Sequence, residues 1–265
     1  MMRIANVARL ALVLVFFVIG LSPPVQALDR EKLLSDPGVF ATFAVFSVDD
    51  VWWRLDREAR AKVGEEIKGA LDKHGEQVVT DLYLLRGLSD RADLMLRLHS
   101  TELARHQHVV LDVLATSLGR YLRLVYTFHG ITKPAIYVSG FSDELKTTMK
   151  IPPDPGPKPY AIVVPIRKDA EWWNLPQAAR SEMMLEHAQV TSPYLRTVKR
   201  KLYHASGLDD LDFITYFETA RLDEFHNLIM ALERIKENRH NRRFGHPTLL
   251  GTVCTVEELA EVFAR

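Results

Sequence analysis

Cysteine is almost absent from this sequence, because Cys254 is the single cysteine in 265 residues. No intrachain disulfide can form with one cysteine, even in an oxidising compartment, and no group can be attached covalently through a cysteine pair. The fold must therefore be stabilised by packing, by a bound cofactor or by contacts between subunits.

An excess of charge of either sign is also missing. The chain holds 34 lysines and arginines and 34 aspartates and glutamates, so its formal charge is zero. A near-neutral chain lacks the basic footprint of a nucleic-acid-binding protein, and we expect no nucleic-acid partner. With 47% hydrophobic and 26% charged residues, the composition is that of a globular protein with a core.

No apolar run is long enough to span a bilayer. The run from Leu10 to Leu21 has twelve residues, whereas a membrane-spanning helix needs about 20. Arg3 and Arg9 precede this run, and a small-residue pattern ends at Ala27. This arrangement predicts a signal peptide over residues 1–27, cleaved after Ala27, and a periplasmic protein without stable membrane insertion. A membrane anchor is the alternative, which the length of the run disfavours.

The remaining chain shows one order of elements twice: strand, helix, strand, strand, helix, strand. The patterns fall first at residues 40–48, 50–73, 76–85, 92–99, 101–118 and 121–128. They recur at 161–167, in a helix that begins near 176, and at 197–206, 213–218, 221–238 and 248–253. Five prolines between Pro152 and Pro159 exclude a helix or a central strand there. We therefore predict an N-terminal unit at 28–150, a linker at 151–160 and a C-terminal unit at 161–265.

The duplication is also visible as amino-acid identities between the two units. A shift of 120 positions gives seven identities in nineteen positions and places Trp52 and Trp53 on the pair Trp172 and Trp173. The predicted fold class is α+β, with duplicated ferredoxin-like βαββαβ units that bury their bare sheet faces together in a dimeric-type α+β barrel.

A histidine in the second unit is a candidate metal ligand. His187 follows Met183 and Met184, so it lies on or near the apolar face of its helix, where a neutral imidazole needs a partner. A ligating histidine usually donates its other N–H to a carboxylate, and Glu237 is a candidate for that role. At the matching position of the first unit the residue is Ile67, so only the second unit can offer this ligand.

Arg200 follows His187 by thirteen residues and lies in a predicted strand. Period-two geometry places Val198, Arg200 and Leu202 on one face, and Phe213, Thr215 and Phe217 share a face of the returning strand. If Arg200 points inward, it forms a pocket for a small anion, and with His187 it can flank a flat cofactor such as a non-covalent haem. The alternative is that Lys199, Arg200 and Lys201 form a basic edge in water.

Three further residues precede the histidine. Trp172 and Trp173 are either core aromatics or residues that pack on a porphyrin edge. Lys168 is either an exposed lysine or a partner for a propionate.

The segment from Tyr160 to the C-terminus resembles the chlorite dismutase family, and the rest of the mature chain resembles it more loosely. The resemblance is carried by RKDAEWWNLP, by LEH at Leu185 to His187, by VKRKLYHASGLDDLDFITYFET and by IKENRHNRRFGHPTLLGT. It implies one non-covalent haem b per chain, with His187 as proximal ligand, Glu237 as the carboxylate that holds it, and Arg200 as distal arginine. The other implied contacts are Leu202, Thr215 and Phe217 on the distal side, Trp172 and Trp173 at the haem edge, and Lys168 and Tyr137 at the propionates.

The resemblance also implies an activity. Chlorite would be converted to chloride and dioxygen through a ferryl iron and hypochlorite, in an enzyme of the large-subunit, pentameric branch. The family includes coproheme decarboxylases, which generally lack the distal arginine, so Arg200 favours the chlorite-degrading branch. The alternative is a haem-binding or decarboxylase-like member without chlorite activity.

Overall fold

The computed structural model describes residues 28–134 and 140–265. The predicted signal peptide, 1–27, and Tyr137 lie outside these residues. In the two described ranges, no helix combines the length and the apolar character needed to cross a membrane.

The strands form where the alternating apolar patterns predict them. In the N-terminal unit they are β1 (Phe40–Val48), β2 (Val79–Leu84), β3 (Leu94–Ser100) and β4 (Leu122–Ile131). In the C-terminal unit they are β5 (Tyr160–Lys168), β6 (Val198–His204), β7 (Phe213–Thr219), β8 (Asn241–Phe244) and β9 (Leu249–Cys254). The short strand β8 is an addition to the predicted order.

The helices are shorter and more numerous than predicted. The N-terminal half holds α1 (Arg30–Ser35), η1 (Trp52–Arg54), α2 (Arg57–Arg60), α3 (Val63–Asp72), α4 (Leu103–Leu114) and η2 (Leu118–Tyr121). The remainder holds α5 (Asp143–Met149), α6 (Ala170–Asn174), α7 (Gln177–Thr191), η4 (Ser192–Tyr194), α8 (Leu222–Leu232), η5 (Lys236–His240) and α9 (Val256–Phe263). The single helix predicted over 50–73 is wrong, because Leu55 is extended (φ −69°, ψ 150°) and interrupts it.

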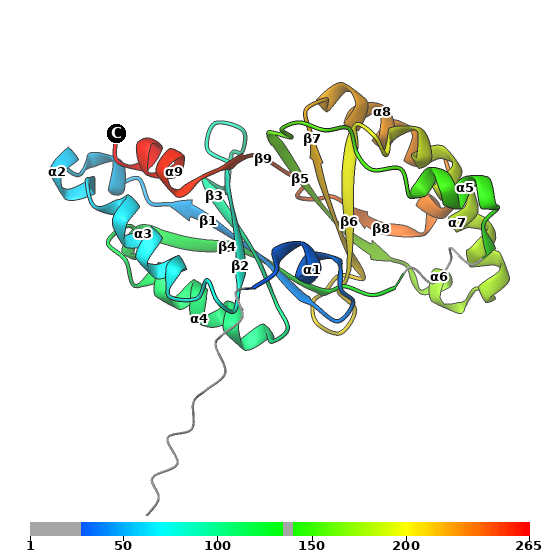
Figure 1. Cartoon of the computed structure of the whole chain (residues 1–265), viewed down its shortest axis with the longest axis horizontal. Helices are drawn as coiled ribbons and strands as arrows, with labels where there is room; N and C mark the ends of the chain where they lie inside the picture. The colour runs from blue at the N-terminus through cyan, green and yellow to red at the C-terminus, as the bar shows by residue number, and fades with distance from the viewer. Residues whose placement is uncertain (1–27, 135–139) are drawn as a thin grey trace, which may run out of the picture.

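The strands close into a barrel. The order is β7-β6-β4-β1-β3-β2-β9-β5-β8, and a further pairing of β5 with β7 completes the ring. The two units meet where β2 pairs with β9 and where β4 pairs with β6. The helices cover the two outer flanks, with α2, α3 and α4 on one side and α6, α7 and α8 on the other (Figure 1). This is the predicted α+β fold of duplicated ferredoxin-like units.

The two bare sheet faces bury one another inside the barrel. Phe43 and Met95 of the first unit pack in one apolar cluster with Tyr203, Ile214 and Tyr216 of the second. Because side chains alternate along a strand, the other face of each sheet meets its own helices. The same strands β6 and β7 therefore face the barrel interior on one side and the α7 helix on the other.

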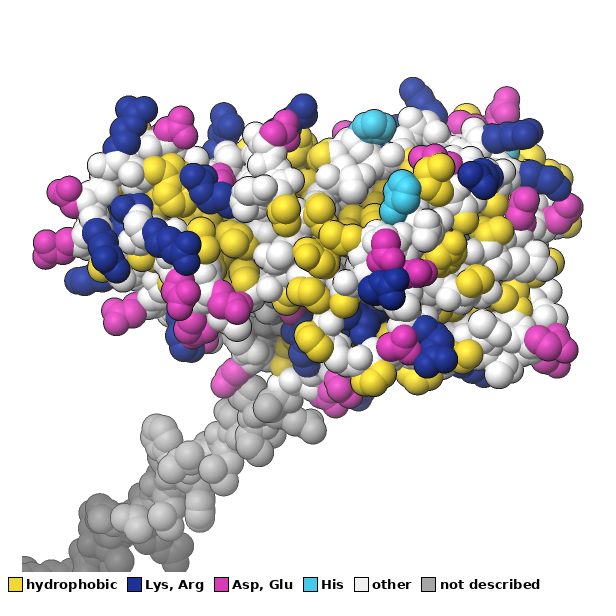
Figure 2. Space-filling view, turned by 90° about the horizontal axis from the view of Figure 1, so that it is seen from above, with side chains coloured by type: hydrophobic (Ala, Val, Ile, Leu, Met, Phe, Trp, Pro, Cys, Tyr) yellow, Lys and Arg dark blue, Asp and Glu magenta, His cyan; other side chains and the backbone are white. Residues whose placement is uncertain are grey.

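The helical side of the first unit is a filled core. Ile67, which matches His187, is 2% exposed and packs with Trp52 and Phe263. On the face seen in Figure 2, basic and acidic side chains are interspersed around apolar ones, without a large field of one sign.

Candidate functional site

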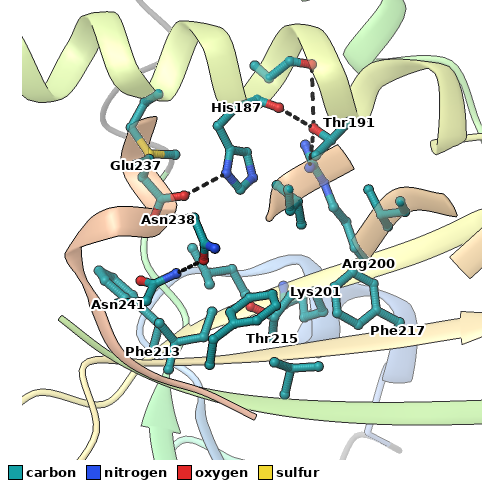
Figure 3. A pocket seen from close by; sticks show the side chains of 18 of the residues that line it. His187, Thr191, Arg200, Lys201, Phe213, Thr215, Phe217, Glu237, Asn238 and Asn241 are labelled. Atoms are coloured by element: carbon teal, nitrogen blue, oxygen red, sulfur yellow. Dashed lines mark hydrogen bonds and ion pairs between the residues drawn. The ribbon is translucent and has the colours of Figure 1, made fainter. Parts of the chain in front are cut away.

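A cavity of about 460 Å³ lies between the helices and the sheet of the second unit. Its size falls within the roughly 300–1,000 Å³ of small-molecule and cofactor sites. Helix α7 forms one wall and strands β6 and β7 form the opposite one (Figure 3). The cavity thus occupies, in the second unit, the space that the core around Ile67 fills in the first.

The register of β6 and β7 decides which side chains face the cavity. Arg200 is paired with Phe217, and Leu202 is paired with Thr215. Directly paired residues of antiparallel strands share a face, and all four of these line the cavity. The basic edge in water is therefore limited to Lys199, which is exposed and forms an ion pair with Glu218 at 3.1 Å.

Arg200 extends from β6 across to α7. Its guanidinium donates a hydrogen bond to Thr191 Oγ1 at 3.1 Å, and that hydroxyl donates to the carbonyl of His187 at 2.8 Å. Burial lowers the pKa of Arg200, but a guanidinium stays protonated at any physiological pH. Within the described residues no carboxylate forms an ion pair with Arg200, so its charge is available to an anion.

His187 is held by a carboxylate on its far side. Its Nδ1 lies 3.2 Å from Glu237 Oε2. Because a carboxylate can only accept, Nδ1 carries the proton and the lone pair of Nε2 is left for a metal. Burial, with the charges of Arg200 and Lys168, lowers the pKa of His187 to about 3. The imidazole is therefore neutral at neutral pH, as metal ligation requires.

Lys168 lines the cavity, and the propionate role that the resemblance implies for it stays a prediction. Its ammonium is buried, forms an ion pair with Glu237 and lies 4.5 Å from the centre of the Trp172 ring. Burial lowers the pKa of Lys168, and the carboxylates of Asp169 and Asp212 act in the opposite direction. Because the ammonium is already held by Glu237, the structure gives Lys168 a role in fixing the carboxylate that orients His187.

The two tryptophans differ in their exposure to solvent. Trp172 is 2% exposed and Trp173 is 45% exposed, although both line the cavity. The buried Nε1 of Trp172 has no hydrogen-bond partner among the described residues. A buried donor without a partner is costly, so this N–H is available to a polar group in the cavity.

Some cavity residues were not predicted from the sequence. Val164 and Ile166 share a face of β5 with Lys168, and period-two alternation was the signal that could have found them. Phe141 and Met149 also line the cavity, but they come from the segment between β4, the last strand of the first unit, and β5. No local pattern relates that segment to a site in the second unit.

The fold and the cavity define a class of protein, an α+β barrel with a histidine-bearing cofactor pocket in one of two repeated units. A sequence model of a family described as chlorite dismutase matches residues 60–254. The chain is 38% identical over 238 residues to a chlorite dismutase of Ideonella dechloratans, covering 89% of this chain and 84% of that one. The chain belongs to the chlorite dismutase family. It is also 28% identical over 205 residues to a coproheme decarboxylase of Mycolicibacterium smegmatis, covering 76% and 85%.

Solved structures agree with this assignment. A mutant chlorite dismutase from Candidatus Nitrospira defluvii superposes with a TM-score of 0.87 at 52% identity, covering 89% of this chain and 100% of that chain. The same relative in complex with imidazole gives a TM-score of 0.88 at 52% identity, covering 90% and 100%. A heme-binding protein from Thermus thermophilus, at 21% identity and a TM-score of 0.70, covers 87% and 96% and supports the fold alone.

Proposed function

We propose that this protein is a haem-dependent enzyme that converts chlorite to chloride and dioxygen. The observation that carries the proposal is the placement of His187 and Arg200 in one cavity, one on the helix wall and the other on the sheet wall. The 38% identity to a named chlorite dismutase supports it independently.

The cavity suits a haem b held without covalent bonds, one per chain. Its lining is largely apolar, the free Nε2 of His187 is a metal ligand, and the unpartnered N–H of Trp172 can donate to a carboxylate of the macrocycle. The first unit offers a buried Ile67 at the matching place. When bound, the haem would supply an iron that accepts an oxygen atom from chlorite.

The remaining tasks fall to the chain itself. Arg200 attracts the chlorite anion, orients it by hydrogen bonds and retains the hypochlorite that leaves after the first oxygen transfer. Phe217 is buried, and Leu202 presents an apolar side chain to the cavity although it is 45% exposed, so this side of the pocket offers the anion few competing hydrogen-bond partners. Glu237 fixes the orientation of His187 and makes its ring more basic.

Export and assembly are part of the same proposal. The charge pattern and small-residue site before Leu28 support cleavage after Ala27 and a periplasmic location. The resemblance to the large-subunit branch supports a homo-oligomer, with a pentamer as the expected number. A light-scattering mass of one subunit for the mature chain would rule out the assembly.

The function is tested with haem-loaded wild-type protein in an oxygen electrode. We expect a Soret band on loading and release of dioxygen when chlorite is added. Bound haem without oxygen release would favour the haem-binding or decarboxylase-like alternative, for which the 28% identity to a coproheme decarboxylase is the supporting observation. A chain that binds no haem would contradict both.

A further inference from the structure

The helix that follows each repeated unit packs on the other unit. Strand β9 ends the second unit, and the helix α9 after it packs on α3 of the first unit, where Leu259 and Phe263 are buried. The approach is close, because a Cβ at Gly64 of α3 would lie 2.8 Å from the Cβ of Ala260. Figure 1 shows α9 over the first unit and α5 beside α7 in the second.

Helix α5 follows the last strand of the first unit and makes the reciprocal contact. Phe141, directly before it, and Leu145 within it are buried in a cluster with Ala188 of α7, and Leu185 packs against the same cluster. Leu185 and Ala188 lie on either side of His187 in the sequence. The contact of α5 is therefore with the helical turn that carries the predicted ligand.

Helix α7 is only partly buried near that turn. Of its fifteen residues only Ala188 and Thr191 are buried. Its inner side, including Met184 and His187, lines the cavity and does not meet a filled core. The position of the helix backbone at His187 thus depends on what packs beside the cavity. Helices α8 and η5 hold α7 on one side, and α5 adds an apolar contact at Leu185 and Ala188.

Helix α5 is capped at its N-terminus, and the chain beyond its C-terminus is bonded to the segment after α7. Ser142 caps its N-terminus by accepting a hydrogen bond from the N–H of Leu145 at 3.2 Å. Beyond its C-terminus, Asp154 forms an ion pair with Arg196 at 2.9 Å, and its N–H donates to the carbonyl of the same residue. The chain after α5 is therefore held against the segment that follows α7, which limits the movement of α5 relative to α7.

We propose that α5, which follows the unit without the histidine, is a positioning element for His187 and acts through Leu145 and Phe141. This inference rests on the proposed haem function. A ligand must be held within about 0.5 Å of its working geometry by the packing around it. The segment that follows the last strand of the first unit thus contributes to a site formed by residues of the second unit.

The test compares matched leucine truncations in α5 and α9, the two helices that pack on the opposite unit. Leu145→Ala opens space beside Ala188, whereas Leu259→Ala opens comparable space in the core of the first unit. Both variants, in the full mature chain, are loaded with haem. The rate of haem transfer to excess apomyoglobin and the iron–histidine stretching band of the ferrous protein are then measured.

We expect haem loss from Leu145→Ala to be roughly 10-fold faster than from wild type, with a shifted or broadened band, as when the supports of a metal ligand are removed. Leu259→Ala should lower thermal stability and leave both signals at their wild-type values. Leu145→Met, which keeps the volume, should restore both. If Leu145→Ala does not fold, Leu145→Val replaces it with the same expected direction.

Two results would overturn the inference. One is a wild-type haem-transfer rate and band in Leu145→Ala or Leu145→Val. The other is an equal change in Leu259→Ala, which would mean that general loss of stability is the cause. Wild-type protein that holds no haem would instead contradict the proposed function, so the two failures are distinguishable.

Discussion

The carboxylate of Glu237 contacts two basic side chains at once. One oxygen accepts from His187 Nδ1 at 3.2 Å, and the other is paired with the buried ammonium of Lys168. Replacing it therefore does more than change the orientation of the imidazole, because the buried Lys168 also loses its ion-pair partner.

Glu237→Ala should lower the free energy of unfolding of the haem-free chain by about 3–5 kcal/mol, the usual loss when one partner of a buried ion pair is removed. The double variant Lys168→Met with Glu237→Ala should recover much of that loss, since no buried charge is left unpaired. Equilibrium urea denaturation measures both. A double variant as unstable as Glu237→Ala would show that the lysine does not carry the effect.

At the scale of single residues, the sequence predicted that His187 lies near the apolar face of its helix, where the structure places it in the cavity lining, but it was ambiguous for the neighbours of His187. Period-two alternation predicted that Arg200 and Leu202 share a face, but it could not decide whether that face meets water or the cavity. That depends on the pairing of Arg200 with Phe217 and on the helix above them. The contact of Lys168 with Glu237 joins residues 69 positions apart, and no local pattern predicts it.

At the scale of elements, the strands were predicted from the sequence, whereas helices α5 and α9 were not. Alternation of apolar residues over 40–48 or 213–218 is a strong local signal, whereas α5 and α9 bury their apolar sides against the opposite unit. A signal for α9 was nevertheless present. Thr255 and Glu258 form a capping box, and Leu259 and Phe263 recur at helical spacing.

Phe263→Ala tests the contribution of α9 to the first unit. Phe263 is fully buried against Trp53, with ring centres 5.5 Å apart. Its truncation should lower the free energy of unfolding by about 3–5 kcal/mol. The exposed neighbour Glu261→Ala should change it by no more than about 0.5 kcal/mol. Urea denaturation of the two variants is the comparison, and equal stabilities would place α9 outside the core.

At the scale of the whole molecule, the helical side of the first unit is a filled core in which polar groups are also buried. That interior includes buried histidines. His106 is 1% exposed and hydrogen-bonded to Thr42 and Ser100, at 2.8 and 2.9 Å. Burial, with a further contribution from His129, lowers the pKa of His106 to about 4.

Acid should therefore destabilise the chain. The unfolded state takes up a proton at His106 near its ordinary pKa of about 6.5 and the folded state only near 4, so stability present above pH ~6.5 is lost as the pH falls toward 4. The expected loss from this residue is about 3 kcal/mol. His106→Gln should flatten the slope of unfolding free energy against pH, and the exposed His108→Gln should not. Parallel slopes in all three proteins would contradict the assignment to His106.

The central claim is that the cavity of the second unit degrades chlorite and that Arg200 retains the anion there. It is tested most directly by oxygen yield per chlorite and by haem absorbance during turnover, with and without methionine as a hypochlorite scavenger. Arg200→Ala should bind haem and begin turnover, but release hypochlorite, bleach its haem and yield less oxygen. Lys199→Ala, an exposed residue on the opposite face of the same strand, should match wild type. Wild-type oxygen yield and haem lifetime in Arg200→Ala would contradict the account.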